Sequence, residues 1–225
     1  MHAVSKSLTL ASVVVLALSL HCAAIAQEHS EGAPHQFEDT SHWAQVFESP
    51  ARAKWQKPDE VVRALDLKPG QTVVDIGAGT GYFTRRFARL VGPSGKAIGL
   101  DIEPGMVAYM KADAARLKLP NYQARMVKPD DPELAPHCAD LIFFCDVLHH
   151  LGNRVAYLEK LKPALKPGGR IAVIDFKRNS PIGPPSAMRI SREQMVATFE
   201  QAGFDLVKRH DFLPYQYFLE FAPSK

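Results

Sequence analysis

The chain has 225 residues, enough for one domain of ordinary size with its own hydrophobic core. Hydrophobic residues make up 46% and charged residues 23%, values that exclude a disordered, collagen-like or coiled-coil protein. The formal net charge is only +3 and the basic residues are spread along the chain, so no nucleic-acid partner is expected.

The first 26 residues have the pattern of an export signal. Lys6 is the only basic residue among them apart from histidine, residues 8–20 are apolar or small, and Ala24-Ile25-Ala26 matches the small-x-small pattern of a cleavage site. We therefore expect a signal peptide over residues 1–26, cleavage before Gln27, and an exported protein that is periplasmic or secreted. The alternative is an uncleaved membrane anchor, although the apolar run is short for a bilayer span. Membrane contact is expected only through this segment.

Residues 27–57 form a polar lead-in that we expect to be partly flexible. Three histidines lie among its acidic residues: His29, His35 and His42. Their spacing fits no compact metal site, so no metal is predicted. We expect the aromatic residues Trp43, Phe47 and Trp55 to dock this segment onto the domain or over a pocket.

A regular pattern of helices and strands begins at Pro58 and continues to the end of the predicted domain, residues 58–225. Pro58 and two acidic residues open the first helix, which Lys68-Pro69-Gly70 ends. The apolar periodicity then predicts strands over 72–76, 97–102, 122–127, 141–145 and 171–176, and helices over 82–91, 104–117, 154–165 and 191–202. Ser191 and Gln194 form a capping box for the last helix, and Gly203 stops it.

The order of these elements predicts an α/β protein. Strands that alternate with helices form right-handed βαβ units, with a parallel sheet covered on both faces. Residues 204–212 and 215–221 follow with only Leu213-Pro214 between them, and so short a connection forces an antiparallel hairpin. The sheet should therefore be parallel for five strands and end in an antiparallel pair.

The strongest functional signal is the turn after the first strand, Gly77-Ala78-Gly79-Thr80-Gly81. Glycines allow positive φ and the close approach of a ligand, and doubly wound folds bind ligands at the carboxyl ends of their strands. The dinucleotide pattern G-x-G-x-x-G would need glycine at position 82, where Tyr82 stands. Asp75 precedes the turn by two residues, and its charge would repel a pyrophosphate but suit a ligand that carries an ammonium and a sulfonium.

Asp101 closes the second predicted strand, twenty residues beyond Gly81. A carboxylate at this place can accept both hydroxyls of a ribose, which NAD and S-adenosylmethionine (SAM) both offer. The alternative role of Asp101 is to cap the helix that begins near Pro104.

At this point the chain resembles the class I SAM-dependent methyltransferases. The resemblance rests on residues 73–83, Gly99-Leu100-Asp101, residues 139–151 and residues 165–175, which follow the family's order, and it covers residues 58–221. It implies a three-layer Rossmann-like sandwich with a seven-stranded, mostly parallel sheet of order 3-2-1-4-5-7-6 and an antiparallel last strand. It also implies SAM as the cofactor.

The resemblance assigns cofactor-binding residues one by one. Asp75, Gly77, Gly79 and Gly81 resemble the loop around the methionine part of SAM. Asp101 resembles the ribose carboxylate, and Ile102 resembles the residue that packs on adenine. Asp130 or Asp131 resembles the acid that receives the adenine amine, although many relatives have Gly-Asp where this chain has Lys128-Pro129-Asp130-Asp131.

The fourth predicted strand ends in Cys145-Asp146-Val147-Leu148-His149-His150, at the edge that faces the SAM sulfonium and the acceptor. Cys145 is accordingly placed beside the cofactor, and no partnered base supports a nucleophilic role for it. Asp146, His149 or His150 could remove a proton from the acceptor. The alternative is that these residues only shape the pocket and cap the next helix.

The sequence thus predicts a methyltransferase that acts on a small-molecule or lipid-like acceptor. The alternatives are a SAM-binding protein without turnover and a nicotinamide-dependent oxidoreductase, which the glycine spacing disfavours. Arsenic methylation would need a set of thiols, and only two cysteines follow residue 26. We expect the acceptor walls to come from residues 36–57, residues 177–189 and the aromatic hairpin 212–221, whose aromatic rings favour an apolar or ring-bearing acceptor.

Overall fold

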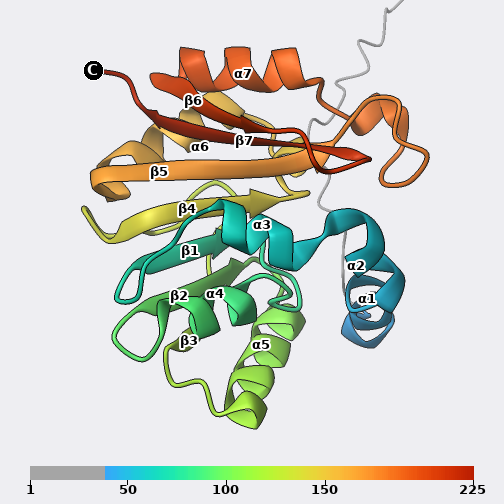
Figure 1. Cartoon of the computed structure of the whole chain (residues 1–225), viewed down its shortest axis with the longest axis vertical. Coiled ribbons are helices and arrows are strands. Elements are labelled where there is room, and N and C mark those ends of the chain that lie inside the picture. The colour runs from blue at the N-terminus through green and yellow to red at the C-terminus, as the bar shows by residue number, and fades with distance from the viewer. Residues whose placement is uncertain (1–38) are drawn as a thin grey trace, which may run out of the picture. The chain divides into compact units, whose positions relative to one another are not determined.

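Seven strands form one sheet in the order β3-β2-β1-β4-β5-β7-β6 (Figure 1). The structure is a computed structural model that describes residues 39–225, so the expected signal peptide, its cleavage site, His29 and His35 lie outside the described residues. Strand β7 pairs antiparallel with both neighbours and the remaining pairs are parallel, which confirms the predicted sheet. The strands are β1 (Thr72–Ile76), β2 (Lys96–Asp101), β3 (Tyr122–Met126), β4 (Ala139–Cys145), β5 (Leu165–Phe176), β6 (Phe204–His210) and β7 (Gln216–Pro223).

The largest difference from the predicted strands is the start of β5. Lys166-Pro167-Gly168-Gly169 has the composition of a turn, but Leu165 already pairs with Ala139 of β4. The register then shifts between Ala139 and Leu141, and this irregularity accommodates the proline and glycines within the pairing.

The helices of the described chain are α1 (Thr40–Phe47), α2 (Pro50–Gln56), α3 (Pro58–Ala64), α4 (Thr84–Val91), α5 (Pro104–Leu117), α6 (Arg154–Leu161) and α7 (Arg192–Gln201), with short 3-10 turns η1 (Leu148–His150), η2 (Lys162–Ala164) and η3 (Ser186–Met188). The capping box of α7 is confirmed, since both reciprocal hydrogen bonds between Ser191 and Gln194 are present. Helix α6 is shorter than predicted because Pro163 cannot continue it, and the chain passes into η2.

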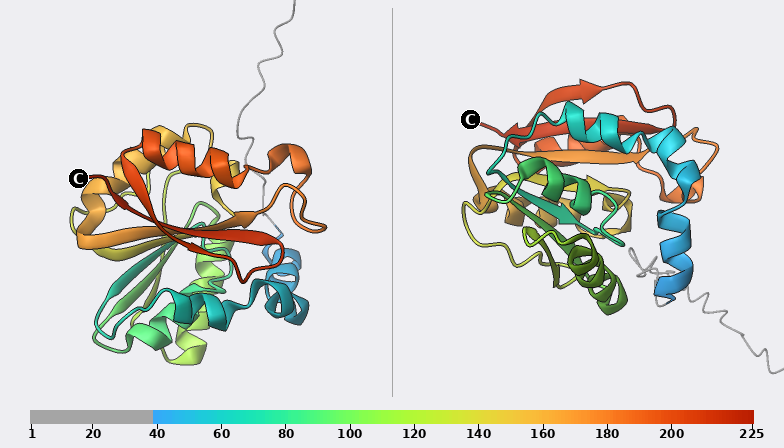
Figure 2. Two further views of the ribbon diagram at one scale, coloured as in Figure 1. Left: turned by 45° about the horizontal axis from the view of Figure 1, so that its top comes forward. Right: turned by 60° about the horizontal axis from the view of Figure 1, so that its bottom comes forward.

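Two hydrophobic cores cover the two faces of the sheet. Neighbouring residues of a strand point to opposite faces, so Val73 packs on the side of α3, α4 and α5, and Val74 packs on the side of α6 and α7. Burial on both faces explains why residues 141–144 are all apolar. Two further orientations in Figure 2 show helices on either side of the sheet.

Residues 40–56, part of the expected flexible lead-in, form the helices α1 and α2. Each begins at a side-chain cap: Asp39 accepts a hydrogen bond from the backbone N–H of His42, and Ser49 accepts one from that of Ala51. Pro50 then occupies the first turn of α2, where a proline is favoured. The two helices lie together at one end of the sheet (Figure 1). Among the described residues, no helix combines the length and apolar character needed to cross a bilayer.

Candidate functional site

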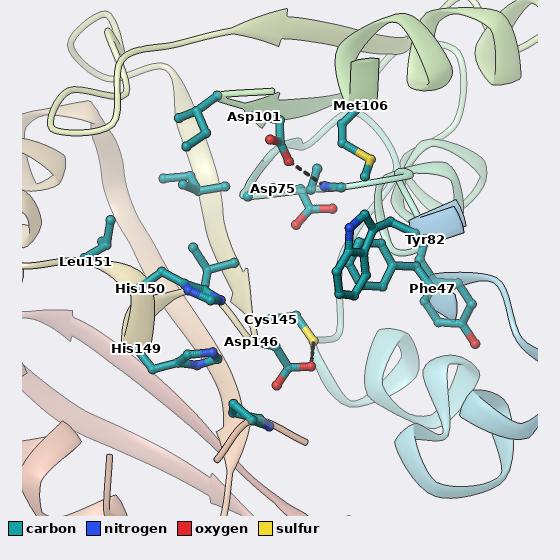
Figure 3. Close-up of a pocket in the computed structure, with 18 of the residues that line it drawn as sticks. Phe47, Asp75, Tyr82, Asp101, Met106, Cys145, Asp146, His149, His150 and Leu151 are labelled. Carbon is teal, nitrogen blue, oxygen red and sulfur yellow. Dashed lines mark hydrogen bonds between the residues drawn. The ribbon is translucent and has the colours of Figure 1, made fainter. Parts of the chain in front are cut away.

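A cavity of about 1410 Å³ opens where β1, β2 and β4 end. The residues that follow these strands line one side of it, among them Gly77, Ile102 and Asp146, and residues of α1 and α2 line another. In doubly wound sheets the carboxyl ends of the strands form the ligand-binding edge. Figure 3 shows Asp75, Asp101 and the side chains after β4 gathered around this cavity.

The glycine turn after β1 brings its backbone to the cavity. Gly77, Gly79 and Gly81 have φ values of +66°, +55° and +75°, in the region that favours glycine. A Cβ on Gly77 would lie 2.5 Å from a methyl carbon of Val147, so glycine here lets the turn pack against the segment after β4. A Cβ on Gly79 would meet only the ring of Phe47, at 3.4 Å. Both Gly79 and Phe47 line the cavity, so Gly79 leaves room for a ligand close to the backbone.

Asp75 is an almost fully buried carboxylate beneath this turn, only 3% exposed, and it lines the cavity. Its Oδ2 accepts a hydrogen bond of 2.6 Å from the hydroxyl of Thr84. Burial raises the pKa of Asp75 to about 7, although the Thr84 bond and the charge of Arg52 oppose this shift. A buried carboxylate of this kind is stabilised in its ionised form by a cationic ligand.

Asp101 at the end of β2 is held by two backbone donors. The N–H of Gly79 donates to Oδ2 at 2.7 Å, and the N–H of Glu103 donates to Oδ1 at 3.0 Å. Burial raises the pKa of Asp101, while these two bonds oppose the rise. A carboxylate can accept about four hydrogen bonds, so capacity remains for two ribose hydroxyls. Ile102 lines the cavity beside it with 36% of its surface exposed.

The two acids predicted to contact adenine lie in different places. Asp130 lines the cavity, and its backbone carbonyl accepts a hydrogen bond of 2.7 Å from Lys160 Nζ. Asp131 is not one of the cavity-lining residues, and its Oδ1 accepts a bond of 2.8 Å from the N–H of Glu133. Of the two, the geometry therefore leaves Asp130 as the adenine candidate.

A buried polar network surrounds the end of β4. Asp146 has φ +62°, an unusual value outside glycine, and its Oδ1 accepts a bond of 2.6 Å from Gln216 Nε2. Gln56 Nε2, at the end of α2, contacts both Asp146 Oδ2 at 3.2 Å and Cys145 Sγ at 3.0 Å. Burial, together with the nearby charge of Asp175, raises the pKa of Asp146 to about 6. Burial also raises the pKa of Cys145, which keeps the thiol protonated and opposes a nucleophilic role.

His149 has a partner that the sequence did not reveal. Its Nδ1 lies 3.0 and 3.1 Å from the two carboxylate oxygens of Asp175, a fully buried residue near the end of β5. Burial alone would lower the pKa of His149, but the hydrogen bond and charge of Asp175 outweigh it and raise that pKa. His150 also lines the cavity, and its ring centroid lies 4.2 Å from that of His149.

Helices α1 and α2 are clamped to the domain by Glu48. Its carboxylate accepts two bonds from the Arg85 guanidinium, at 2.6 and 2.8 Å, and one of 2.5 Å from the hydroxyl of Thr80. Because Thr80 belongs to the glycine turn and Arg85 to α4, the clamp connects the cofactor loop to the segment that covers it. The rings of Trp43, Phe47 and Trp55 line the cavity, which confirms that they dock over a pocket.

The expected acceptor walls are found only in part. Residues 182–185 line the cavity, as expected for the segment 177–189. The hairpin 212–221 does not, and that prediction is wrong: its Phe218 and Phe212 pack into the core with His210 instead. The hairpin reaches the site only indirectly, because Gln216 donates a bond to Asp146 and accepts one from Gln56.

Four residues of the site were not identified from the sequence: Glu48, Gln56, Asp175 and Gln216. A usable signal existed for Asp175, because it stands near the end of a predicted strand, as Asp75 and Asp101 do. Gln56 and Gln216 had no such signal, because a glutamine side chain does not by itself indicate a functional role in a sequence. Within residues 39–225, no three His, Cys, Asp or Glu side chains are grouped so that they could hold a metal ion.

The sheet order, the glycine turn after β1 and the carboxylates of Asp75 and Asp101 define a Rossmann-like protein that binds a cationic nucleoside. Residues 67–209 match the sequence profile of a family described as methyltransferase domain. The chain belongs to this family: it is a class I SAM-dependent methyltransferase, and SAM is its cofactor.

Curated relatives include the ubiquinone/menaquinone biosynthesis C-methyltransferase UbiE of Hahella chejuensis, 30% identical over 63% of this chain and 62% of the relative. The arsenite methyltransferase of Halobacterium salinarum is 26% identical over 63% of this chain and 39% of the relative. The chain therefore spans less than two thirds of the length of these relatives. A SAM-dependent methyltransferase structure from Aquifex aeolicus is 27% identical, has a TM-score of 0.76, and is matched over 81% of this chain and 97% of that chain.

The residues present fit SAM. Gly79 leaves the turn open on its cavity side, Asp101 keeps free acceptor capacity, and Asp75 provides a buried negative charge. These three features match the shape, the ribose and the positive charge of SAM in turn.

Proposed function

We propose that the protein transfers the methyl group of SAM to a small organic acceptor bound beneath α1 and α2. The observation that supports this proposal is a cavity of about 1410 Å³ that extends from the glycine turn to the residues after β4. Ligand pockets usually measure about 300–1,000 Å³. This cavity is therefore large enough for a second ligand beside SAM.

SAM supplies an activated methyl group when it is bound, so the protein has to hold two ligands in line and keep water out. Alignment of two reactants can lower a barrier by about 7–11 kcal/mol. Asp75 and Asp101 hold the SAM side. The Glu48 clamp fixes the covering helices, and with them the aromatic rings of Trp43 and Trp55, over the acceptor side.

The walls of the acceptor side favour an apolar, ring-bearing molecule. Trp55 and Phe176 both line the cavity, with ring centroids 5.7 Å apart, and together offer an aromatic wall to a bound molecule. The named relatives act on chemically different acceptors, so their names do not select one. An arsenic acceptor is not supported, because Cys145 is the only cysteine of residues 39–225 that lines the cavity.

Calorimetry with SAM and with NAD tests the cofactor, and only SAM should bind. Release of S-adenosylhomocysteine on addition of cell extract tests turnover, with Asp101→Asn as the matched variant of reduced SAM affinity. SAM binding without any product across fractionated extracts would instead support a SAM-binding protein without turnover.

We also propose that the protein is exported. The support is the apolar stretch 8–20 followed by Ala24-Ile25-Ala26, a sequence pattern that lies outside the described residues. Mass spectrometry of the protein from its native envelope should find Gln27 at the N-terminus. An intact hydrophobic segment would support a membrane anchor instead.

A further inference from the structure

We propose that His149 removes a proton from a ring hydroxyl of the acceptor and that Asp175 positions His149 for this step. The inference deepens the proposed function and rests on it, because it names the acceptor's chemical class and the base that activates it. Both residues belong to the described part of the chain, and only His149 lines the cavity.

The hydrogen bonds of the pair define which nitrogen can act. Asp175 is fully buried and its Oδ1 also accepts a bond of 2.7 Å from the N–H of Phe176, so the carboxylate is fixed in place. Nδ1 of His149 is directed at both carboxylate oxygens and therefore carries the proton that it donates to them. The lone pair then lies on Nε2, for which residues 39–225 provide no hydrogen-bond partner. His149 extends toward the same cavity as Asp146 (Figure 3).

The charges around His149 favour proton uptake by its ring. Asp175 on β5 and Asp146 after β4 favour the protonated ring, whereas Arg154 on α6 disfavours it. The ring of His150, on the same 3-10 turn, lies at a centroid distance of 4.2 Å and is tilted by 42°, and Tyr217 of β7 lies near both carboxylates. The anionic neighbours prevail and raise the pKa of His149, which strengthens it as a proton acceptor.

A base that is held in position beside the acceptor favours a hydroxyl acceptor over an amine. A neutral amine attacks with its own lone pair and can lose its proton to water afterwards, so it needs no base at the site. A hydroxyl oxygen is a weak nucleophile until its proton leaves. The aromatic walls, with Trp55 and Phe176 on the acceptor side, favour a hydroxyl carried by a ring.

The methyl transfer needs no reactant other than SAM and the acceptor. The acceptor O–H bond breaks and its proton passes to His149 Nε2, while the oxygen electron pair forms the new bond to the methyl carbon. The bond from that carbon to sulfur breaks, and its electron pair stays on sulfur. The imidazolium that results is stabilised by Asp175 and returns its proton to solvent when the products leave.

The test uses the full chain with SAM and three probes: 4-methoxyphenol, 4-nitrophenol and benzylamine. His149→Gln should lower kcat on 4-methoxyphenol by about 10²–10⁴-fold. The loss should be much smaller on 4-nitrophenol at pH 8, because the pKa of this phenol lies near neutrality and leaves it mostly ionised at that pH without a base. Asp175→Asn should lower kcat and move the acidic limb of the pH profile to lower pH, because loss of the carboxylate lowers the pKa of His149.

His210→Asn is the matched control. His210 forms the same kind of pair with a carboxylate, at 2.7 Å from Glu220, but neither residue lines the cavity. This variant should keep the wild-type kcat and pH profile on both phenols. Calorimetry should show unchanged SAM affinity in all three variants, which reports that each is folded.

An equal loss on both phenols in His149→Gln, or an unshifted profile in Asp175→Asn, would show a structural role and overturn the inference. Wild-type protein that binds SAM but methylates benzylamine alone, or neither phenol, would overturn the hydroxyl assignment. Wild-type protein that binds no SAM would refute the proposed function itself, which is a distinguishable result.

Discussion

Asp75→Asn should make the protein more stable and bind SAM less tightly. In the ligand-free protein, burial moves the pKa of Asp75 from 3.8 to about 7. Each pKa unit corresponds to 1.36 kcal/mol, so ionised Asp75 destabilises the native state by up to about 4 kcal/mol at pH 8. Asparagine has nearly the same shape, carries no charge, and can still accept the hydrogen bond from Thr84.

The direction in which stability changes with pH follows from proton binding by Asp75. Between about pH 4 and pH 7 the native state binds the Asp75 proton more tightly than the unfolded chain does, so stability falls as pH rises through this range. The penalty is complete above about pH 7 and fades toward pH 4. The asparagine variant lacks it at every pH, and its advantage over the wild type should therefore grow with pH.

The assay is urea unfolding of the wild type and Asp75→Asn at pH 5 and pH 8, with SAM titrations at pH 8. We expect a gain of at least about 1 kcal/mol at pH 8, or about 2–4 °C in Tm, and a smaller gain at pH 5. Asp59→Asn is the control, because that side chain is 78% exposed and its loss should change stability little at either pH. An Asp75→Asn variant that is no more stable than the wild type at pH 8, or whose gain is the same at both pH values, would refute a raised pKa of Asp75.

Other expected outcomes concern the cofactor and the covering helices. Asp101→Asn should lose about 2–3 kcal/mol of SAM affinity, a decrease of about 30- to 150-fold, because a charged acceptor of the ribose is lost; calorimetry with unchanged affinity would contradict this role. Gly79→Val should also weaken SAM binding strongly with little change in the circular dichroism spectrum, since φ is +55° and the added side chain would project toward the cavity. Glu48→Gln should raise the acceptor KM more than it lowers kcat and should reduce stability by about 1 kcal/mol, because its bonds to Arg85 and Thr80 weaken. Steady-state kinetics in which only kcat falls would instead assign Glu48 a part in the chemical step.

The sequence by itself determined the sheet and placed Asp75 and Asp101 at its ligand-binding edge. Apolar runs and turn residues are local signals, so strands such as Thr72–Ile76 and helices such as Pro104–Leu117 were predicted at their observed bounds. The position of Asp75 and Asp101 at the cavity was also predictable, because both stand next to strand ends that any parallel sheet brings to one edge. The helices of residues 40–56 had local signals as well, in Asp39 and in Ser49-Pro50, but their polar composition concealed them.

Only the tertiary structure decided what surrounds the acceptor. Gln56 meets Gln216 across 160 positions of the sequence, and His149 meets Asp175 across 26. Such pairs form because separate elements pack against the same sheet end, and no periodicity along the chain records which side chains will then meet. The same packing buries these groups and thereby raises the pKa values of Asp146 and His149, so the chemistry of the acceptor side is a property of the folded chain.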